Sequence, residues 1–188
     1  MKSFFDHFGL LAPYYEVFIH PQPPKKLVSL IHPESHGIIL DAGGGTGRVS
    51  QYLHSQATQI VIADEAYKML REAQKKDGIQ TACSHTESLP FKSNSFTLII
   101  MVDALHHVAD QPKTAAELWR VLAPGGQIII EEPNIQLSGV KAMALAEKLA
   151  LMRSHFLSPA QMLNLFQDNA AKKRLELEDT SAWIIIEK

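Results

Sequence analysis

A chain of 188 residues, 46% of them hydrophobic and 20% charged, has the size and composition of one globular domain spanning residues 1–188. Its formal net charge of −2 provides no basic field, so we expect no nucleic-acid partner. The single cysteine, Cys83, excludes an internal disulfide and favours a reducing, cytoplasmic compartment. Because Cys83 lies in an apolar-leaning segment, we expect its thiol to be buried and inert.

The first 37 residues predict an N-terminal helical cap. Apolar side chains recur at helical spacing over residues 4–12, and Pro13 is expected to end that helix. A second helix, opened by Pro24, is predicted over 25–31. Charged residues interrupt the apolar N-terminus, so it does not match a signal peptide. No segment reaches the roughly 20 apolar residues that a membrane span requires.

Strands and helices alternate between residues 37 and 132. The predicted strands cover 37–42, 59–63, 79–83, 96–102 and 127–132. The predicted helices cover 46–55, 66–76 and 110–122. The runs 60–62, 98–100 and 128–130 are entirely aliphatic, which is typical of parallel strands covered on both faces. The alternation therefore predicts βαβ units in a doubly wound α/β sheet.

The pattern changes after Pro133. A helix with an unusually wide apolar face is predicted over 137–153, and a capping box at Ser158 opens a helix that runs to about 169. Two strands, about 174–179 and 182–187, close the chain. For the helix over 137–153 and the phenylalanine-rich N-terminus we favour simple core packing. The alternatives are that they line an apolar pocket, cover the site as a lid, or pack against each other or a second subunit.

A glycine-rich loop follows the first predicted strand. The pattern is Asp41-x-Gly43-x-Gly45-x-Gly47, in which glycine allows a tight turn and a close approach to a ligand. A dinucleotide site would instead need Gly-x-Gly-x-x-Gly, but Arg48 or Ser50 occupies the third position in the two available registers. The spacing disfavours a nicotinamide-dependent oxidoreductase.

This loop resembles motif I of the class I methyltransferases that use S-adenosylmethionine, and further resemblances follow in the same order as in that family. The best match is the branch related to the ubiquinone and menaquinone biosynthesis C-methyltransferases. The matching segments are Asp64 with Glu65–Leu70, Thr86–Phe91, Asn94–Phe96, Leu105–Val108 and Glu117–Gly126, with weaker matches at Phe5–Asp6 and Ala12–Glu16.

The resemblance implies a Rossmann-like, doubly wound and mostly parallel sheet of seven strands, with helices on both faces and the last strand antiparallel. It implies a cofactor-binding core over 38–132, followed by substrate-side helices and C-terminal strands over 133–188. S-adenosylmethionine is the implied cofactor and S-adenosylhomocysteine its product. The implied cofactor-binding residues are Tyr15, Asp41, Gly43, Gly45, Gly47, Asp64, Glu65, Met69, His85, Thr86, Glu87 and Val102.

Two positions depart from the family pattern. His85 stands where the family usually has an acid that contacts the adenine amino group, and an imidazole offers an acceptor only through one neutral nitrogen. Thr97 stands where the family usually has an aspartate. Neither departure alters the expected fold.

Methyl transfer from a sulfonium needs alignment of donor and acceptor and, at most, a base for a protic acceptor. Candidates for a catalytic role are His106, His107, His155 and Glu132, although hydrogen bonding within the core is the simpler interpretation of each histidine. We expect no metal site, because adjacent histidines should point in different directions and no third ligand is evident.

The sequence therefore favours an S-adenosylmethionine-dependent methyltransferase that acts on a small acceptor, with a quinone-like or lipid-like molecule as one candidate. The alternative is a non-catalytic module that binds the cofactor and regulates a partner. A homodimer also stays open, through the apolar N-terminus or the helix over 137–153.

Overall fold

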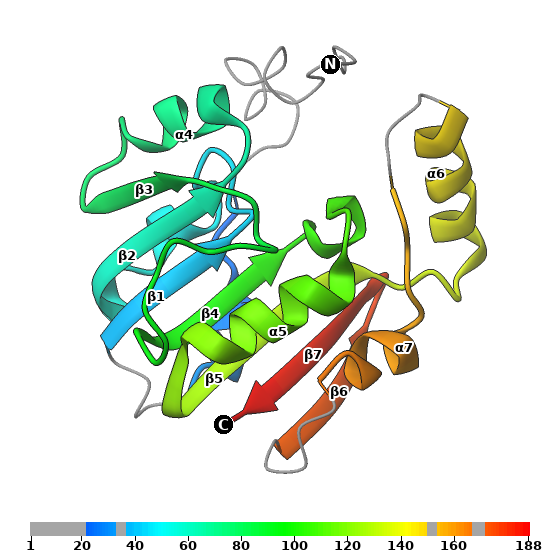
Figure 1. Cartoon of the computed structure of the whole chain (residues 1–188). Coiled ribbons are helices and arrows are strands. Elements are labelled where there is room, and N and C mark those ends of the chain that lie inside the picture. Colours follow the sequence, from blue (N-terminus) through cyan, green and yellow to red (C-terminus); the bar gives the residue numbers. More distant parts are fainter. Residues whose placement is uncertain (1–21, 33–36, 150–153, 167–171) are drawn as a thin grey trace.

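The computed structural model describes residues 22–32, 37–149, 154–166 and 172–188 (Figure 1). Within these residues, seven strands form a single sheet in the order β3-β2-β1-β4-β5-β7-β6. The strands are β1 (Gly37–Ala42), β2 (Ala57–Asp64), β3 (Ile79–Cys83), β4 (Phe96–Val102), β5 (Leu122–Pro133), β6 (Lys172–Glu178) and β7 (Ser181–Glu187). The predicted helix over 4–12 and Tyr15 lie outside the described residues.

The strand pairing confirms the predicted doubly wound sheet. Neighbouring strands from β3 to β5 run parallel, whereas β7 is antiparallel to both β5 and β6. The aliphatic runs are fully covered: Ile60, Ile99 and Ile128 each expose 1% or less of their surface. Because the sheet reverses its order between β1 and β4, the carboxyl ends of these two strands are where a ligand is expected to bind.

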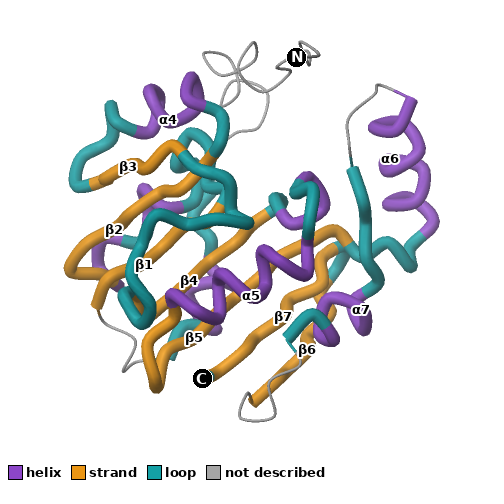
Figure 2. Tube along the Cα trace, viewed as in Figure 1, coloured by secondary structure: helices purple, strands orange, loops and turns teal. Residues whose placement is uncertain are grey.

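Helices cover both faces of this sheet, which gives the Rossmann-like architecture (Figure 2). On one face lie α5 (Gln111–Val121) and α7 (Pro159–Asn164), which contribute Leu118 and Met162 to the larger core cluster. On the other face α3 (Lys25–Leu30) contributes Leu27. The helix α4 (Tyr67–Ala73) packs against β2 and β3. The predicted capping box at Ser158 is confirmed.

The helix predicted over 46–55 is not formed. Two short 3₁₀ turns, η2 (Ser50–Tyr52) and η3 (His54–Gln56), take its place. Gly47 has a left-handed φ of 75°, and the Ser50 hydroxyl donates to Asp41 at 2.6 Å instead of pointing to solvent. Both features compete with regular α-helical geometry, so the segment forms two short 3₁₀ turns instead of an α-helix.

Two burial predictions are wrong. Cys83 is exposed, because it ends the edge strand β3. In α6 (Ser138–Leu149) only Val140 is buried, while Leu145 and Leu149 expose 58% and 76% of their surface. Figure 1 shows α6 standing away from the sheet, so its described part does not pack into the core. No helix in the described part of the chain is long and apolar enough to cross a membrane.

Candidate functional site

The glycine loop follows β1 and uses three left-handed residues. Gly43, Gly45 and Gly47 have φ values of 73°, 54° and 75°. A Cβ on Gly43 would lie 2.7 Å from the Ala104 methyl carbon, so the loop also packs tightly against the chain after β4. A Cβ on Gly45 would meet nothing nearer than the Asp64 carboxylate at 4.0 Å. The glycines therefore serve both the turn and a close approach to Asp64.

Asp64 joins the glycine loop to the end of β2. One carboxylate oxygen accepts a hydrogen bond from the Gly45 amide at 2.9 Å, and the other accepts from the Ala66 amide at 2.7 Å. Burial raises the pKa of Asp64, and the two amide bonds partly offset that rise. Each oxygen keeps a further lone pair, so a fixed carboxylate can still accept from two neighbouring hydroxyls of a ligand.

Asp41 is buried under the glycine loop and contacts it directly. Its carboxylate is 2% exposed and accepts a hydrogen bond from the Ser50 hydroxyl. Burial raises the pKa of Asp41 to about 6, although the bond from Ser50 opposes the rise. A Cβ on Gly44 would lie 2.4 Å from the Asp41 carboxyl carbon, so the loop closes directly over this side chain. The predicted contact of Asp41 with the cofactor stays a prediction.

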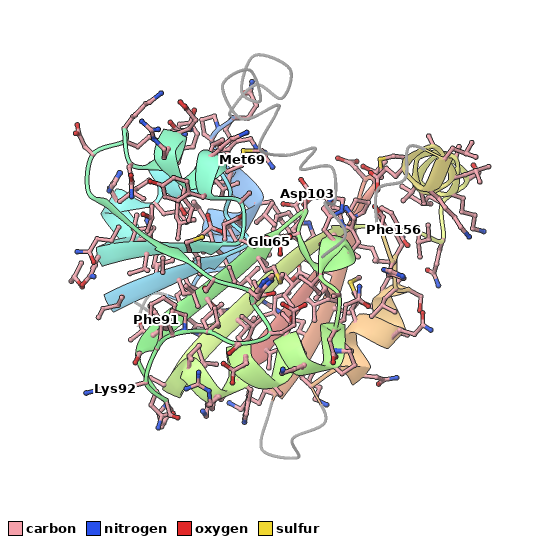
Figure 3. The ribbon with its side chains drawn as sticks, turned by 45° about the horizontal axis from the view of Figure 1, so that its top comes forward. Glu65, Met69, Phe91, Lys92, Asp103 and Phe156 are labelled. Atoms are coloured by element: carbon pink, nitrogen blue, oxygen red, sulfur yellow. The ribbon has the colours of Figure 1, made fainter. Side chains whose placement is uncertain are left out.

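Glu65 and His85 lie beside Asp64 and face solvent. Their side chains pair at 2.8 Å while exposing 69% and 72% of their surface. Met69 is 3% exposed and packs in the core, and Figure 3 shows how Glu65 and Met69 lie on the ribbon. Two exposed polar groups at the ends of β2 and β3 can flank a planar ligand, whereas Met69 contributes packing.

Thr86 and Glu87 are engaged with α5. The buried Thr86 hydroxyl hydrogen-bonds to Thr114, and Glu87 accepts from the amides of Ala109 and Asp110. Two further residues of α5 secure the same loop. Glu117 accepts from the Leu89 amide, and Arg120 donates to the carbonyls of Leu89 and Phe91. The loop that carries His85 is thus fixed by structural contacts.

Sequence reasoning missed a charged group at the ends of β4 and β5. Asp103 has a left-handed φ of 51° and pairs with Arg48 from the glycine loop at 3.2 Å. Burial, followed by the charge of Asp103, raises the pKa of Glu131 to about 7. Left-handed backbone in a non-glycine residue and a raised carboxyl pKa are both frequent at functional sites. The predicted contact Val102 immediately precedes Asp103, and the strain at Asp103 has no signal in the sequence.

Glu132 organises the chain after β4. Its carboxylate is 2% exposed and accepts from the amides of Ala104 at 3.0 Å and Leu105 at 2.7 Å. Its second oxygen lies 2.5 Å from Nδ1 of His106, whose ring stacks on Phe156 at 4.3 Å. Burial alone lowers the pKa of His106, but the Glu132 bond and nearby acidic charges raise it overall.

His107 lies against His106 and turns toward α6. The two ring centroids are 4.0 Å apart at 47°, so the expectation that the rings diverge is wrong. Burial and the neighbouring His106 lower the pKa of His107 to about 3. Glu147 supplies the third side chain that was not evident in the sequence: one ligand atom from each of His106, His107 and Glu147 lies within 4.8 Å of the others.

The remaining predicted histidine, His155, contacts this region through main-chain hydrogen bonds. Its amide donates to the His106 carbonyl at 2.7 Å, and its carbonyl accepts from the Gln111 side chain at 2.7 Å. Next to it, the Ser154 hydroxyl donates to Glu147 at 2.5 Å and lies 3.4 Å from Nδ1 of His107. Residues 154 and 155 therefore hold the segment after α6 against the histidine pair.

Comparison with known proteins shows which proteins this chain resembles. Residues 40–130 match a family model described as a methyltransferase domain. Among curated proteins, the chain is 24% identical over 169 residues to a ubiquinone/menaquinone biosynthesis C-methyltransferase of Acidiphilium cryptum, covering 80% of this chain and 68% of that protein. It is 33% identical over 104 residues to a mitochondrial 2-methoxy-6-polyprenyl-1,4-benzoquinol methylase of Caenorhabditis elegans, covering 50% of this chain and 36% of the relative. The chain thus spans about half or less of the length of most curated relatives it matches.

Solved structures share the fold over nearly the whole chain. A chain from the complex between the Haloferax volcanii Trm112 methyltransferase activator and a putative methyltransferase superposes with a TM-score of 0.83 at 16% identity, covering 98% of this chain and 99% of that one. A possible histamine N-methyltransferase from Thermotoga maritima gives 0.78 at 22% identity, with 96% and 98% covered. The chain is thus similar to methyltransferases both in sequence, over residues 40–130, and in its fold.

Proposed function

We propose that the protein transfers a methyl group from S-adenosylmethionine to a small-molecule acceptor. The observation that carries the proposal is Asp64, whose two carboxylate oxygens are each held by one main-chain amide at the junction of the glycine loop and β2. A carboxylate fixed in this way suits the paired hydroxyls of a ribose. The family match over 40–130 supports the same donor.

The donor would lie across the carboxyl ends of β1, β2 and β3. Asp64 would accept from the ribose hydroxyls, and Glu65 and His85 would flank the adenine. The amides of the glycine loop would approach the methionyl group, above the buried Asp41. Tyr15 stays a proposed contact from the family resemblance, as do Gly43, Gly45, Gly47, Met69, Thr86, Glu87 and Val102.

The acceptor would enter from the side of His106 and His107, beyond the carboxyl ends of β4 and β5. In-line methyl transfer needs the acceptor atom to be held opposite the sulfur, and alignment alone supplies much of the acceleration. The curated relatives are quinone and quinol methyltransferases by name, which favours an apolar, quinol-like acceptor. The exposed leucines of α6 support an apolar acceptor as well.

The alternative is a cofactor-binding module that acts through a partner. The Haloferax volcanii neighbour was solved in a complex with a methyltransferase activator, so a protein partner is the specific condition to consider if the isolated chain binds donor without turnover. A cytoplasmic location and a homodimer stay predictions from the sequence.

Calorimetric titration of the chain with S-adenosylmethionine, S-adenosylhomocysteine and NAD tests the donor. We expect saturable binding of both adenosyl compounds and none of NAD. Asp64→Ala should weaken binding by about 1–3 kcal/mol, because the bonds to the ribose are lost from a buried site. Asp77→Ala, in the exposed turn before β3, is the matched control and should bind normally.

If neither adenosyl compound binds, the donor assignment is refuted. It is also refuted if the Asp64→Ala variant binds the donor as tightly as the parent protein. Formation of S-adenosylhomocysteine with a panel of quinols, phenols and amines then separates the enzyme from the non-catalytic module. Donor binding without turnover on any acceptor, with or without a partner protein, would favour the module.

A further inference from the structure

The three side chains His106, His107 and Glu147 come together from segments far apart in the sequence. The histidines lie on η4 (Leu105–His107), directly after β4, and Glu147 lies near the end of α6. One ligand atom from each lies within 4.8 Å of the other two. We propose that these residues bind a divalent transition-metal cation, with Zn²⁺ as the best match.

The spacing is close to that of a bound ion. If three atoms lie within 4.8 Å of one another, a point exists within about 2.8 Å of all three. Zinc bonds to nitrogen and oxygen are about 2.0–2.2 Å long, so each ligand atom needs to move by about 0.7 Å or less. Glu147 can make such a shift because α6 projects from the sheet and most of its residues are exposed.

The surroundings of His106 fix its orientation. Glu132 engages Nδ1 at 2.5 Å, and the ring stacks on Phe156 at 15°. With Nδ1 engaged, Nε2 is the nitrogen left to meet a cation. A carboxylate behind a histidine is the usual support of a metal-binding imidazole, since it sets the tautomer and the direction of the ring. Glu132 is itself fixed by two main-chain amides.

The chemistry of the three ligands sets the choice of cation. Two imidazoles and one carboxylate suit zinc and similar transition metals, whereas magnesium and calcium prefer oxygen ligands alone. Three protein ligands also leave a coordination position open. That position would hold an ionisable oxygen of the methyl acceptor, a role that rests on the proposed function, whereas cation binding does not.

The test uses the full chain without an affinity tag, stripped of metal by a chelator and titrated calorimetrically with Zn²⁺. We expect one equivalent of Zn²⁺ to bind. When Co²⁺ replaces Zn²⁺, we expect the visible absorption of a cobalt site with a low coordination number. His107→Ala and Glu147→Gln should each weaken Zn²⁺ binding by about 100-fold or more, because loss of a supporting residue alone typically costs 10–100-fold. Glu132→Gln should fall within that smaller range.

Control variants come from two elements that contribute no residue to the cluster of His106, His107 and Glu147. Glu72→Gln, on α4, and His54→Ala, on η3, should leave Zn²⁺ affinity unchanged. Thermal unfolding of each variant identifies those that fail to fold. His107 and Glu147 carry the test, because both are only partly buried and their substitution leaves the Glu132 bonds in place.

Failure to bind a stoichiometric Zn²⁺ would overturn the proposal, and so would equal affinity in the His107 and Glu147 variants. Titration of the same samples with S-adenosylmethionine keeps the two proposals separate. Zinc binding with no donor binding supports the metal site and contradicts the proposed function. Donor binding with no zinc binding contradicts only the metal site.

Discussion

Replacement of Glu132 by alanine should cause a large loss of stability. The Glu132 carboxylate is 2% exposed and accepts from the Ala104 and Leu105 amides, while its other oxygen meets Nδ1 of His106. The variant leaves three buried nitrogens without their partner. Each unsatisfied buried donor costs about 1–3 kcal/mol, and water can enter the vacated space, so we expect a total loss of about 3–5 kcal/mol.

Urea denaturation followed by circular dichroism and tryptophan fluorescence measures this loss. Glu132→Gln should cost only about 1–2 kcal/mol, because its amide oxygen can still accept from Ala104 and Leu105. Glu72→Ala, a partly exposed glutamate on α4, should stay within about 0.5 kcal/mol of the parent protein. If Glu132→Ala lay within 1 kcal/mol of the parent, the carboxylate would not organise the chain after β4. If that variant does not fold, the glutamine variant supplies the measurement.

Two further predictions concern pH and the glycine loop. The pKa of Glu131 is raised to about 7 from 4.5, so the folded state holds a proton that the unfolded state releases. Stability therefore falls as pH rises from about 4.5 to 7, by about 2 kcal/mol after allowance for partial exposure, and Glu131→Gln should remove this dependence in urea titrations at several pH values. Gly47→Ala combines a φ of 75° with a Cβ 2.8 Å from the Ile62 methyl carbon and should cost about 3 kcal/mol. Gly125→Ala has a similar φ of 76° in open space and should cost only about 1 kcal/mol, so equal costs would show that the contact with Ile62 is unimportant.

The sheet could be predicted from the sequence because its signals are local. Continuous aliphatic runs such as 98–100 and 128–130 mark strands buried on both faces, and each falls inside an observed strand. The segment 46–55 was predicted wrongly for a local reason as well. The helix expected there from the alternation of strands and helices competes with the left-handed Gly47 and with the Ser50 bond to the buried Asp41, and the alternation pattern reveals neither competitor.

The burial of α6 and β3 could not be predicted in the same way. Apolar side chains at helical spacing indicate that one face of a helix avoids water, but they do not say what covers it. In the described structure α6 projects from the sheet, with Leu149 76% exposed. The exposure of Cys83 likewise follows from the position of β3 at the sheet edge. That position depends on the order of the strands and not on the residues next to Cys83 in the sequence.

The two halves of the candidate site differ in how strongly the sequence specifies them, and the difference has a physical origin. The half proposed to bind the donor uses main-chain amides and left-handed glycines, and Asp64 follows the loop closely enough for a fixed spacing to reveal both. The histidine half depends on Glu147 reaching back from α6 to His107, a contact of 40 residues' separation for which no spacing rule exists. A relative could therefore keep the donor loop and change its acceptor merely by changing the helix that meets η4. Exchange of α6 between two such relatives should alter acceptor choice and zinc affinity while donor affinity stays the same.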